Sequence, residues 1–297
     1  MKPVLTALIA GALAAAPQAA SAERAWILPS ATTFSGDGSW ATFDAANASE
    51  LFYPDHRPMP LDGMKVWQPD GSYGKIDNAM TGHRRSTFEV KLDKPGTWKI
   101  GTESSMVVGS FMLNGEERRV GRFGGGMGGQ ARPGGAGGPG QPGGAAEPPR
   151  KPPVAVADIP PEATDIKLTE IVSRNEVYVT EDAPTTTLFA PAGKGLELQP
   201  VTHPDELIKG ETATFRFLVD GKPQGGVAIS VVPGGKRYRD QDDGRDFTTA
   251  ADGTVKIAWP AAGMYWINAT LSDNKPSEPK AQQRRMSYMT TVEVLLP

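Results

Sequence analysis

The chain has 297 residues, of which 31 are Lys or Arg, 34 are Asp or Glu, 35 are Gly and 27 are Pro. Gly and Pro make up about a fifth of the sequence, which argues against an all-helical protein and favours short strands joined by turns. The formal charge of −3 lacks the basic excess of a non-specific nucleic-acid binder. Because Cys is absent, disulfides, thiolate catalysis and zinc–thiolate sites are excluded.

The first 22 residues have the pattern of a cleaved secretory signal. Lys2 supplies a positive charge, residues 4–16 are apolar, and residues 20–22 (Ala-Ser-Ala) match an A-x-A cleavage site. The apolar stretch is shorter than the about 20 residues that span a bilayer, and no second run of that length follows. We therefore expect residues 1–22 to be removed, which leaves Glu23 as the first residue of a periplasmic protein with no transmembrane segment.

Residues 23–190 predict a first β-sandwich, because short runs rich in Val, Ile, Thr and aromatic residues alternate with turns. Residues 87–92 alternate polar and apolar side chains, and after a Lys-Pro-Gly turn residues 97–100 return as a second strand. This pattern is typical of strands with one face in a core and the other in solvent.

A Gly- and Pro-rich insertion interrupts this first sandwich at about 121–161. Residues 121–144 are about half Gly, and residues 145–161 continue as a Pro-rich run. Such a composition cannot bury enough apolar surface to offset the entropy of ordering, so we predict a disordered insertion. Beyond it, residues 166–180 contain two alternating runs around Ser-Arg-Asn, which predict a hairpin that returns to the first sheet.

Residues 191–297 predict a second module of about seven short strands, spaced as in a Greek-key sandwich. The predicted fold class is therefore all-β, with two immunoglobulin-like β-sandwich modules. Residues 255–267 repeat the pattern of residues 88–100, in which an alternating strand, a glycine turn and an aromatic-bearing return strand follow one another. Either a duplication or a common way of building a sandwich hairpin explains this similarity.

The three histidines are candidate metal ligands, since His is the commonest metal ligand in proteins. His56 follows Asp55 in a Pro-bounded loop, His83 precedes a strand, and His203 lies near Asp205 at the start of the second module. No pair has the spacing of a local metal motif, so the fold would have to assemble the site. A structural hydrogen bond, a surface loop position or a turn cap is the alternative role for each.

Two further groups of charged residues are candidate binding sites. Residues 238–246 form an acidic loop, but its Gly falls at position 5 instead of 6, which excludes an EF-hand. Arg239 and Arg245 offset the acids, which favours a solvated loop with internal ion pairs. The pairs at residues 84–85 and 284–285 are suited to an anionic ligand, or to discouraging aggregation at sheet edges.

No catalytic motif stands out in the sequence. It contains neither a G-x-S-x-G nucleophile elbow nor a G-K-[ST] phosphate-binding loop. The six Trp residues could stack on sugars, but most fit the cores of the two predicted sandwiches. We therefore expect a protein that is not an enzyme.

Six segments share features with one known family: residues 25–30 (AWILPS), 51–56 (LFYPDH), 195–204 (GLELQPVTHP), 233–240 (PGGKRYRD), 263–266 (GMYW) and 284–288 (RRMSY). Together they resemble the bacterial periplasmic family of unknown function numbered 4198. The resemblance implies an accessory component of nickel or cobalt uptake. It also implies a partner such as an outer-membrane receptor or another component of the uptake system.

Similar proteins commonly begin the mature chain with His, where this sequence has Glu23. An N-terminal amine with an imidazole suits nickel and copper, whereas a carboxylate is a harder ligand. That leaves Asp55, His56 and His203 as the expected metal positions. The expected ligand-binding residues come from the two family-like loops: Tyr53, Tyr238, Arg239 and Asp240.

These observations predict an exported, non-enzymatic binding or accessory protein connected with transition-metal uptake. One alternative is a module that binds carbohydrate or the cell envelope through aromatic side chains. The other is a structural module that binds only proteins. Convergence of the predicted loop residues at one place would favour a binding site over a purely structural role.

Overall fold

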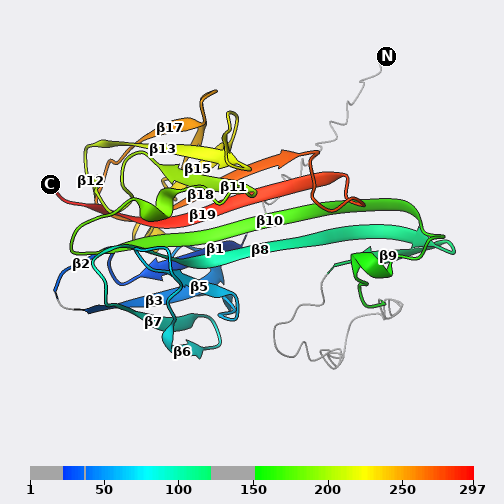
Figure 1. Ribbon diagram of the computed structural model, residues 1–297, viewed down its shortest axis with the longest axis horizontal. Helices are drawn as coiled ribbons and strands as arrows, with labels where there is room; N and C mark the ends of the chain where they lie inside the picture. The colour runs from blue at the N-terminus through cyan, green and yellow to red at the C-terminus, as the bar shows by residue number, and fades with distance from the viewer. Residues whose placement is uncertain (1–22, 37, 122–150) are drawn as a thin grey trace, which may run out of the picture.

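The computed structural model describes residues 23–36, 38–121 and 151–297, which are almost entirely β-structure (Figure 1). The prediction of an all-β protein is therefore confirmed. The helical segments within these ranges are single 3-10 turns: η1 (Val156–Asp158), η2 (Thr187–Phe189) and η3 (Lys236–Tyr238). None of the described helices has the length and apolar character needed to cross a membrane. The predicted signal and positions 122–150 of the predicted insertion lie outside the described residues. For residues 151–161 the predicted disorder is wrong, because Val154 pairs with Val120 and the side chain of Ile159 is buried in an apolar cluster.

The first sheet is formed by strands from the N-terminal half: β1 (Arg24–Pro29), β3 (Ser39–Ala48), β4 (Arg57–Pro58), β6 (Asp77–Thr81) and β7 (Ser86–Leu92). Their order is β1-β3-β7-β6, and β4 pairs with β3 beyond the end of β7. Alternate residues of β3 and β7 are buried, and the directly paired Phe43 and Phe88 stack with ring centroids 5.0 Å apart. The predicted polar–apolar alternation thus gives this sheet one buried face.

The central sheet is shared by both halves of the chain. Its strands are β2 (Thr33–Phe34), β5 (Met64–Trp67), β8 (Gly96–Leu113), β9 (Glu116–Val120), β10 (Thr164–Glu181), β12 (Leu207–Ile208), β15 (Ala228–Pro233), β16 (Arg245–Thr248), β18 (Gly263–Asp273) and β19 (Gln283–Leu295). The main order is β16-β15-β18-β19-β10-β8-β5. The two halves join where β10 and β19 pair in parallel, as Figure 1 shows.

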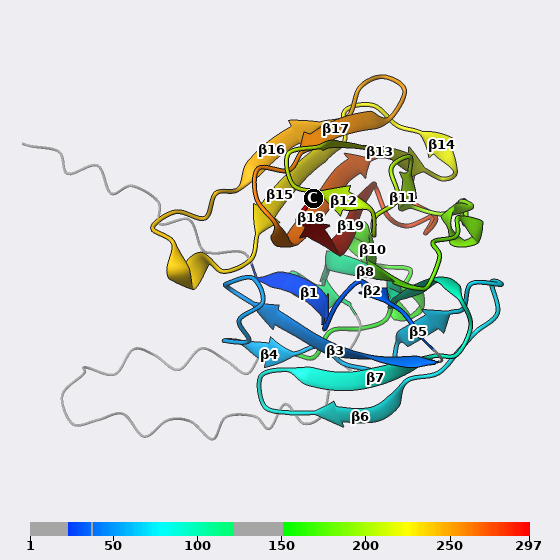
Figure 2. The same ribbon diagram turned by 90° about the vertical axis from the view of Figure 1, so that its left-hand side faces the viewer.

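A third sheet covers the C-terminal half of the central sheet. It contains β11 (Leu196–Pro200), β13 (Thr212–Val219), β14 (Lys222–Pro223) and β17 (Thr254–Ala258), with β11 and β17 on either side of β13. In Figure 2 the first sheet lies on one side of the central sheet and this third sheet lies on the other.

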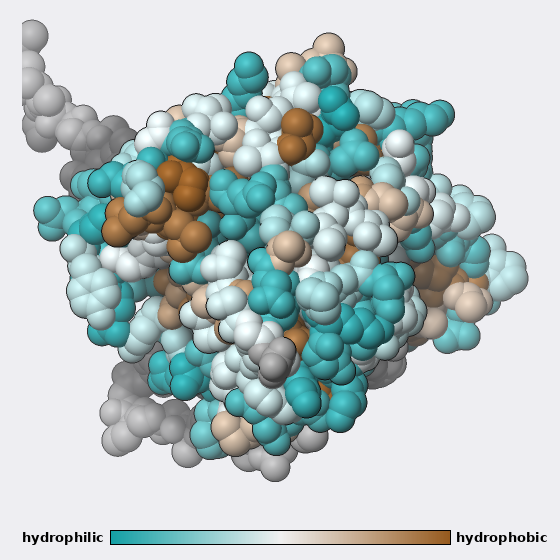
Figure 3. Space-filling model, turned by 60° about the vertical axis from the view of Figure 1, so that its left-hand side comes forward, coloured by the Kyte–Doolittle hydropathy of each residue, from teal (hydrophilic) through white to brown (hydrophobic). Residues whose placement is uncertain are grey.

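The two main cores lie on opposite faces of the central sheet. On β10, Val172 belongs to the core beneath the third sheet, whereas Val177 and Val179 belong to the core beneath the first sheet. Residues an odd number of positions apart point to opposite faces of a strand, which places the cores back to back. Burial of each large apolar side chain contributes about 1.5–3 kcal/mol. The space-filling view in Figure 3 is correspondingly mostly hydrophilic, with apolar groups in separate small patches.

The two repeated segments noted in the sequence are corners between sheets, not hairpins. β7 belongs to the first sheet and β8 to the central sheet, and β17 and β18 are divided between the third and central sheets in the same way. Trp98 Nε1 donates to the carbonyl of Lys94 at 3.0 Å, and Tyr265 Oη donates to the carbonyl of Ala261 at 2.9 Å. Two residues before each aromatic, Gly96 and Gly263 have φ of 122° and 135°. Glycine adopts such angles without a steric cost, so the two corners share one local solution.

The predicted hairpin over residues 166–180 is wrong, because β10 is one unbroken strand. It pairs antiparallel with β8 and parallel with β19 through the Ser-Arg-Asn sequence expected to turn. The side chain of Arg174 is buried and pairs with Glu103 and Glu176. The segment was also expected to pair with the sheet of the first half of the chain, and it does so as one strand, because β10 pairs with β8. The polar triplet is typical of a turn, and the sequence does not show the distant residues with which it pairs in the fold.

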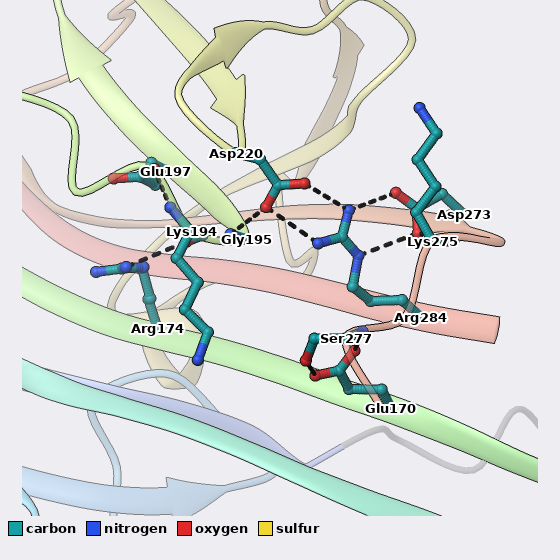
Figure 4. A network of polar contacts seen from close by, with 10 residues as sticks. All are labelled: Glu170, Arg174, Lys194, Gly195, Glu197, Asp220, Asp273, Lys275, Ser277 and Arg284. Atoms are coloured by element: carbon teal, nitrogen blue, oxygen red, sulfur yellow. Dashed lines mark hydrogen bonds and ion pairs between the residues drawn. The ribbon is translucent and has the colours of Figure 1, made fainter. Parts of the chain in front are cut away.

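The basic pair at residues 284–285 also has a structural role. Figure 4 shows the Arg284 guanidinium between the carboxylates of Asp220 and Asp273, with nitrogen–oxygen distances from 2.6 to 3.0 Å. Asp220 also accepts a hydrogen bond from the backbone of Gly195 at 2.8 Å. These contacts join the third sheet to the β18–β19 connection, so Arg284 is occupied by its own chain instead of facing an anionic ligand.

Candidate functional site

Three segments meet at the start of β1: residues 23–24, residues 49–57 and residues 233–245. His56 Nδ1 lies 2.9 Å from Glu23 Oε1, and Arg24 pairs with Asp242 at 2.7 Å. We call these three segments the β1 rim. Figure 2 places η3 and β4 on the same side of the molecule as the start of β1. The rim therefore brings together two of the family-like segments noted in the sequence.

Residues 49–57 form a tight loop held by its own polar groups. The backbone N–H of Ser49 donates to Asp55 Oδ1 at 2.9 Å. Phe52 has φ of 61°, and its ring packs edge-on against Trp26 with centroids 5.7 Å apart. A Cβ on Gly234 would lie 2.5 Å from the Phe52 ring, so glycine is required where the two loops touch. Asp55 thus closes the loop with the carboxylate that was expected to bind metal.

The Glu23 carboxylate is held by two side chains at the end of the loop at residues 49–57. Arg57 donates to it through Nε at 3.0 Å and through an Nη atom at 2.7 Å, and His56 contacts the same carboxylate. The hydrogen bond from Arg57, with a further contribution from His56, lowers the pKa of Glu23. The His56 side chain is 60% exposed, so this cluster is solvated.

This arrangement does not fit a transition-metal ion. Within the described ranges, no group of three or more His, Asp or Glu side chains is placed to hold a metal. The only imidazole at the rim is that of His56, and Arg57 already occupies the carboxylate beside it. A site for nickel or cobalt needs several nitrogen or oxygen donors free of competing cations.

The second loop of the rim separates an internal role from an exposed one. Arg239 donates to the carbonyls of Gly234 and Pro233 at 2.7 and 3.1 Å and pairs with Asp243 at 2.7 Å. It fixes the loop, and its donors are used inside the loop. Tyr238 is instead 90% exposed, and the neighbouring Asp240 is also exposed. The predicted solvated loop with ion pairs is present, although one pair reaches across to β1.

Two guanidinium groups flank the loop at residues 49–57 without a carboxylate partner. Arg237 stacks over the ring of Tyr53 at 4.0 Å, and Arg84 donates to the backbone carbonyl of Asp55 at 3.2 Å. Beside Arg84 is an open hollow of about 400 Å³ lined by Pro54, Met80, Gly82, His83, Arg84, Arg85 and Thr87. Sequence reasoning identified the Arg84-Arg85 pair but missed Arg237, because only the fold brings it to Tyr53.

His203 belongs to a different place. Its Nε2 lies 3.0 Å from Thr97 Oγ1 and 3.2 Å from the carbonyl of Thr185, and its Nδ1 accepts from the backbone N–H of Asp205 at 3.1 Å. Both ring nitrogens are used, and burial lowers the pKa of His203. We call His203, Asp205 and their threonine partners the buried junction.

The buried junction lies at the far end of β1 from the rim. Thr180 of β10 bonds to the backbone of Thr32, three residues beyond the end of β1. The length of β1 therefore separates the junction from the rim by about 20 Å. The structure thus brings together five of the predicted site residues (Tyr53, Asp55, His56, Tyr238 and Arg239) with Asp240 on the same loop, and places His203 elsewhere.

The buried junction contains an ionisable group, Asp205, which the sequence placed near His203 but whose burial it did not predict. The Asp205 carboxyl accepts a hydrogen bond from Thr180 Oγ1 at 2.6 Å and has no cationic partner among the described residues. Burial raises the pKa of Asp205 to about 7. A buried carboxyl without a countercharge destabilises the fold when it ionises at high pH. The sequence carries no signal of its burial.

The solved structures similar to this chain share little of its sequence. A trypsin-activated alpha-2-macroglobulin from Escherichia coli is 12% identical, over 91% of this chain and 16% of that chain, with a TM-score of 0.22. The D0-D1 domain of Intimin is 11% identical, over 91% and 97% of the two chains, with a TM-score of 0.20. A DUF4785 family protein from Legionella pneumophila is 6% identical, over 81% and 50%, with a TM-score of 0.24. At TM-scores this low, the similarity does not establish a shared fold.

No curated protein matches the chain. Residues 20–273 match the family described as Domain of unknown function (DUF4198). The match begins just before β1 and includes both loops of the rim, the buried junction and most strands of all three sheets. Because it spans most of the sequence, this protein belongs to the DUF4198 family.

Proposed function

We propose that this protein is an exported, non-enzymatic accessory protein that binds a partner protein of a periplasmic uptake system through the β1 rim. The observation that carries the proposal is Tyr238, which is 90% exposed at the tip of a loop fixed from within by Arg239. Beside it, Arg237 rests on the ring of Tyr53. Tyr and Arg on a fixed support are the residue types that contribute most to protein interfaces.

The proposal includes an immunoglobulin-like organisation of two modules, at residues 23–190 and 191–297. Both halves divide their strands between a cover sheet and the central sheet in the same way. Each has an aromatic corner with a hydrogen bond to the backbone four residues earlier. A corner of this kind is typical of immunoglobulin-like sandwiches, whose end loops commonly carry recognition.

A partner protein fits the rim better than a bare metal ion does. The nickel or cobalt role implied by the family resemblance would use Asp55, His56 and His203, but Asp55 closes its own loop and His203 lies at the far end of β1 with both ring nitrogens in use. Isothermal titration with Ni²⁺, Co²⁺, Cu²⁺ and Zn²⁺ tests this choice. We expect no saturable one-site heat. A one-site isotherm that disappears in His56→Ala would restore metal binding at the rim.

The carbohydrate alternative has less support. Trp26, Trp98, Trp259 and Trp266 are buried, so these indoles pack within the protein and do not offer a face to a sugar. Trp40 is 47% exposed. The exposed aromatics of the rim are tyrosines accompanied by arginine, a combination suited to a protein partner.

Site-specific photo-crosslinking in the native bacterium tests the proposal. Benzoylphenylalanine at position 238 should capture a discrete envelope protein. The matched control is position 73, where Tyr73 is also highly exposed, near β5, and packs against Trp67 with centroids 6.0 Å apart. Capture of the same products at both positions, or of none at position 238, would contradict a recognition role for the rim.

A further inference from the structure

The unpaired cations of the β1 rim indicate the chemistry of its partner. Arg84 and Arg237 are exposed and contact uncharged acceptors of one short loop, a carbonyl and an aromatic ring. Four other arginines at the rim or beside it are neutralised: Arg24 by Asp242, Arg57 by Glu23, Arg85 by Asp44 and Arg239 by Asp243. Arg245 also lacks a carboxylate partner among the described residues, but it is half-buried and lies over the ring of Phe247 at 5.5 Å. Within the described part of the chain, neither Arg84 nor Arg237 forms an ion pair. Their positive charge is therefore available to a ligand.

Both guanidinium groups are held in place before any ligand arrives. Stacking on Tyr53 orients Arg237, and the bond to the Asp55 carbonyl orients Arg84. A guanidinium presents a planar fork that matches a carboxylate, and holding it in advance reduces the entropy lost on binding. These groups stand out in a protein whose formal charge is −3.

The anchors of the two guanidinium groups are neighbours in the chain. Tyr53 and Asp55 are two residues apart and are joined by a tight turn, in which the N–H of Asp55 donates to the carbonyl of Tyr53 at 3.0 Å. Carboxylates close together on a protein segment therefore match the two guanidinium groups. Asp240 is exposed on the same loop as Arg237 and would repel a dense polyanion such as polyphosphate or an anionic polysaccharide.

We infer that the β1 rim binds an acidic segment of the partner protein, whose carboxylates pair with Arg84 and Arg237 while Tyr238 packs beside them. This inference rests on the proposed function and specifies the class of partner. Each ion pair replaces water around a group that lacks a countercharge, so it adds affinity without breaking an existing bond.

Selection from a random decapeptide phage library tests the inference with the mature protein. Peptides bound by the wild type should be enriched in Asp and Glu. The enrichment should disappear for the double variant Arg84→Gln and Arg237→Gln. Arg285→Gln is the matched control, because Arg285 is an exposed arginine on β19 at the hollow that also includes Ile171 and Thr270. It should select the same acidic peptides as the wild type.

Binding of one selected peptide, measured by fluorescence anisotropy, gives the expected size of the effect. Each single arginine variant should weaken binding about three- to tenfold, and added salt should reduce the difference. Tighter binding of inorganic polyphosphate than of any selected peptide would overturn the inference, as would acidic enrichment that persists in the double variant.

Tyr238→Ala separates failure of the inference from failure of the proposed function. If selected peptides are neutral and their binding depends on Tyr238, the rim recognises a partner but the acidic class is wrong. If Tyr238→Ala and the arginine double variant both select the same peptides as the wild type, the rim is not the recognition surface and both proposals fail.

Discussion

The two ends of β1 each place a histidine near a carboxylate, Glu23 at the rim and Asp205 at the buried junction, yet the two histidines have different roles. At the rim, His56 is exposed and meets a solvated carboxylate that also binds Arg57. At the buried junction, His203 is enclosed, and both its ring nitrogens have fixed partners. The sequence treated the two histidines alike, because residue type alone does not report burial. Burial decides which pair can meet a ligand and which one supports the fold.

The same comparison explains why the two regions should respond differently to pH. In the folded protein Glu23 accepts hydrogen bonds from Arg57 and His56, and its pKa is lowered. Asp205 has only a hydroxyl donor in a buried place, and its pKa is raised to about 7. One carboxyl therefore favours the folded state when ionised, and the other favours it when protonated.

The largest effect should come from Asp205→Asn. In the folded protein the pKa of Asp205 is about 7, above the ordinary value of 3.8 for an aspartate. Ionisation of Asp205 therefore destabilises the folded state more and more as the pH rises from about 4 to 7. Removing the ionisable group should raise the free energy of unfolding at pH 8 by about 2–4 kcal/mol and leave little change at pH 4. Urea unfolding at both pH values measures the difference. Equal effects at pH 4 and pH 8 would show that Asp205 is ionised without penalty.

His203→Ala should be the next largest, with a loss of about 2–3 kcal/mol at pH 8, because it leaves a buried backbone N–H without its acceptor. Burial lowers the pKa of His203 below its ordinary value of 6.5. The neutral ring therefore contributes to the free energy of unfolding above pH 6.5, and this contribution is lost as the pH falls. The loss on substitution should therefore shrink toward pH 5. His203→Asn keeps an acceptor near the Asp205 N–H and should recover part of the stability, whereas equal losses for both variants would argue against this role.

Arg57→Gln at the rim should cost less, about 0.2–1 kcal/mol, because its partner is solvated. A double-mutant cycle with Glu23→Gln isolates the pair, and high salt should remove the coupling. A coupling that persists in high salt would mean that the rim is more enclosed than its exposure indicates.

His56→Ala should have the smallest effect on stability, within about 0.5 kcal/mol, since the side chain is 60% exposed. The same urea unfolding at pH 8 measures it. A loss as large as that of His203→Ala would remove the contrast between the two ends of β1.

The sequence by itself determined the class of the fold. Alternating apolar residues in segments such as 87–92 and 254–258 need only local information, because a strand presents successive side chains to opposite faces. The glycines at the two corners were also evident, since a backbone turn must be made locally. The six family-like segments likewise pointed to the family that the match over residues 20–273 then established, and five of them lie within those residues.

Only the tertiary structure decided how these strands combine and what the polar residues do. The parallel pairing of β10 with β19 joins segments more than a hundred residues apart, and it turned an expected hairpin into one long strand. The fold also sets the two main cores on opposite faces of one sheet. In the same fold His203 is buried, whereas His56 lies in solvent. Pairing partners and burial depend on long-range contacts whose free energy no short segment contains, so the same residue types acquire different roles only once the chain has folded.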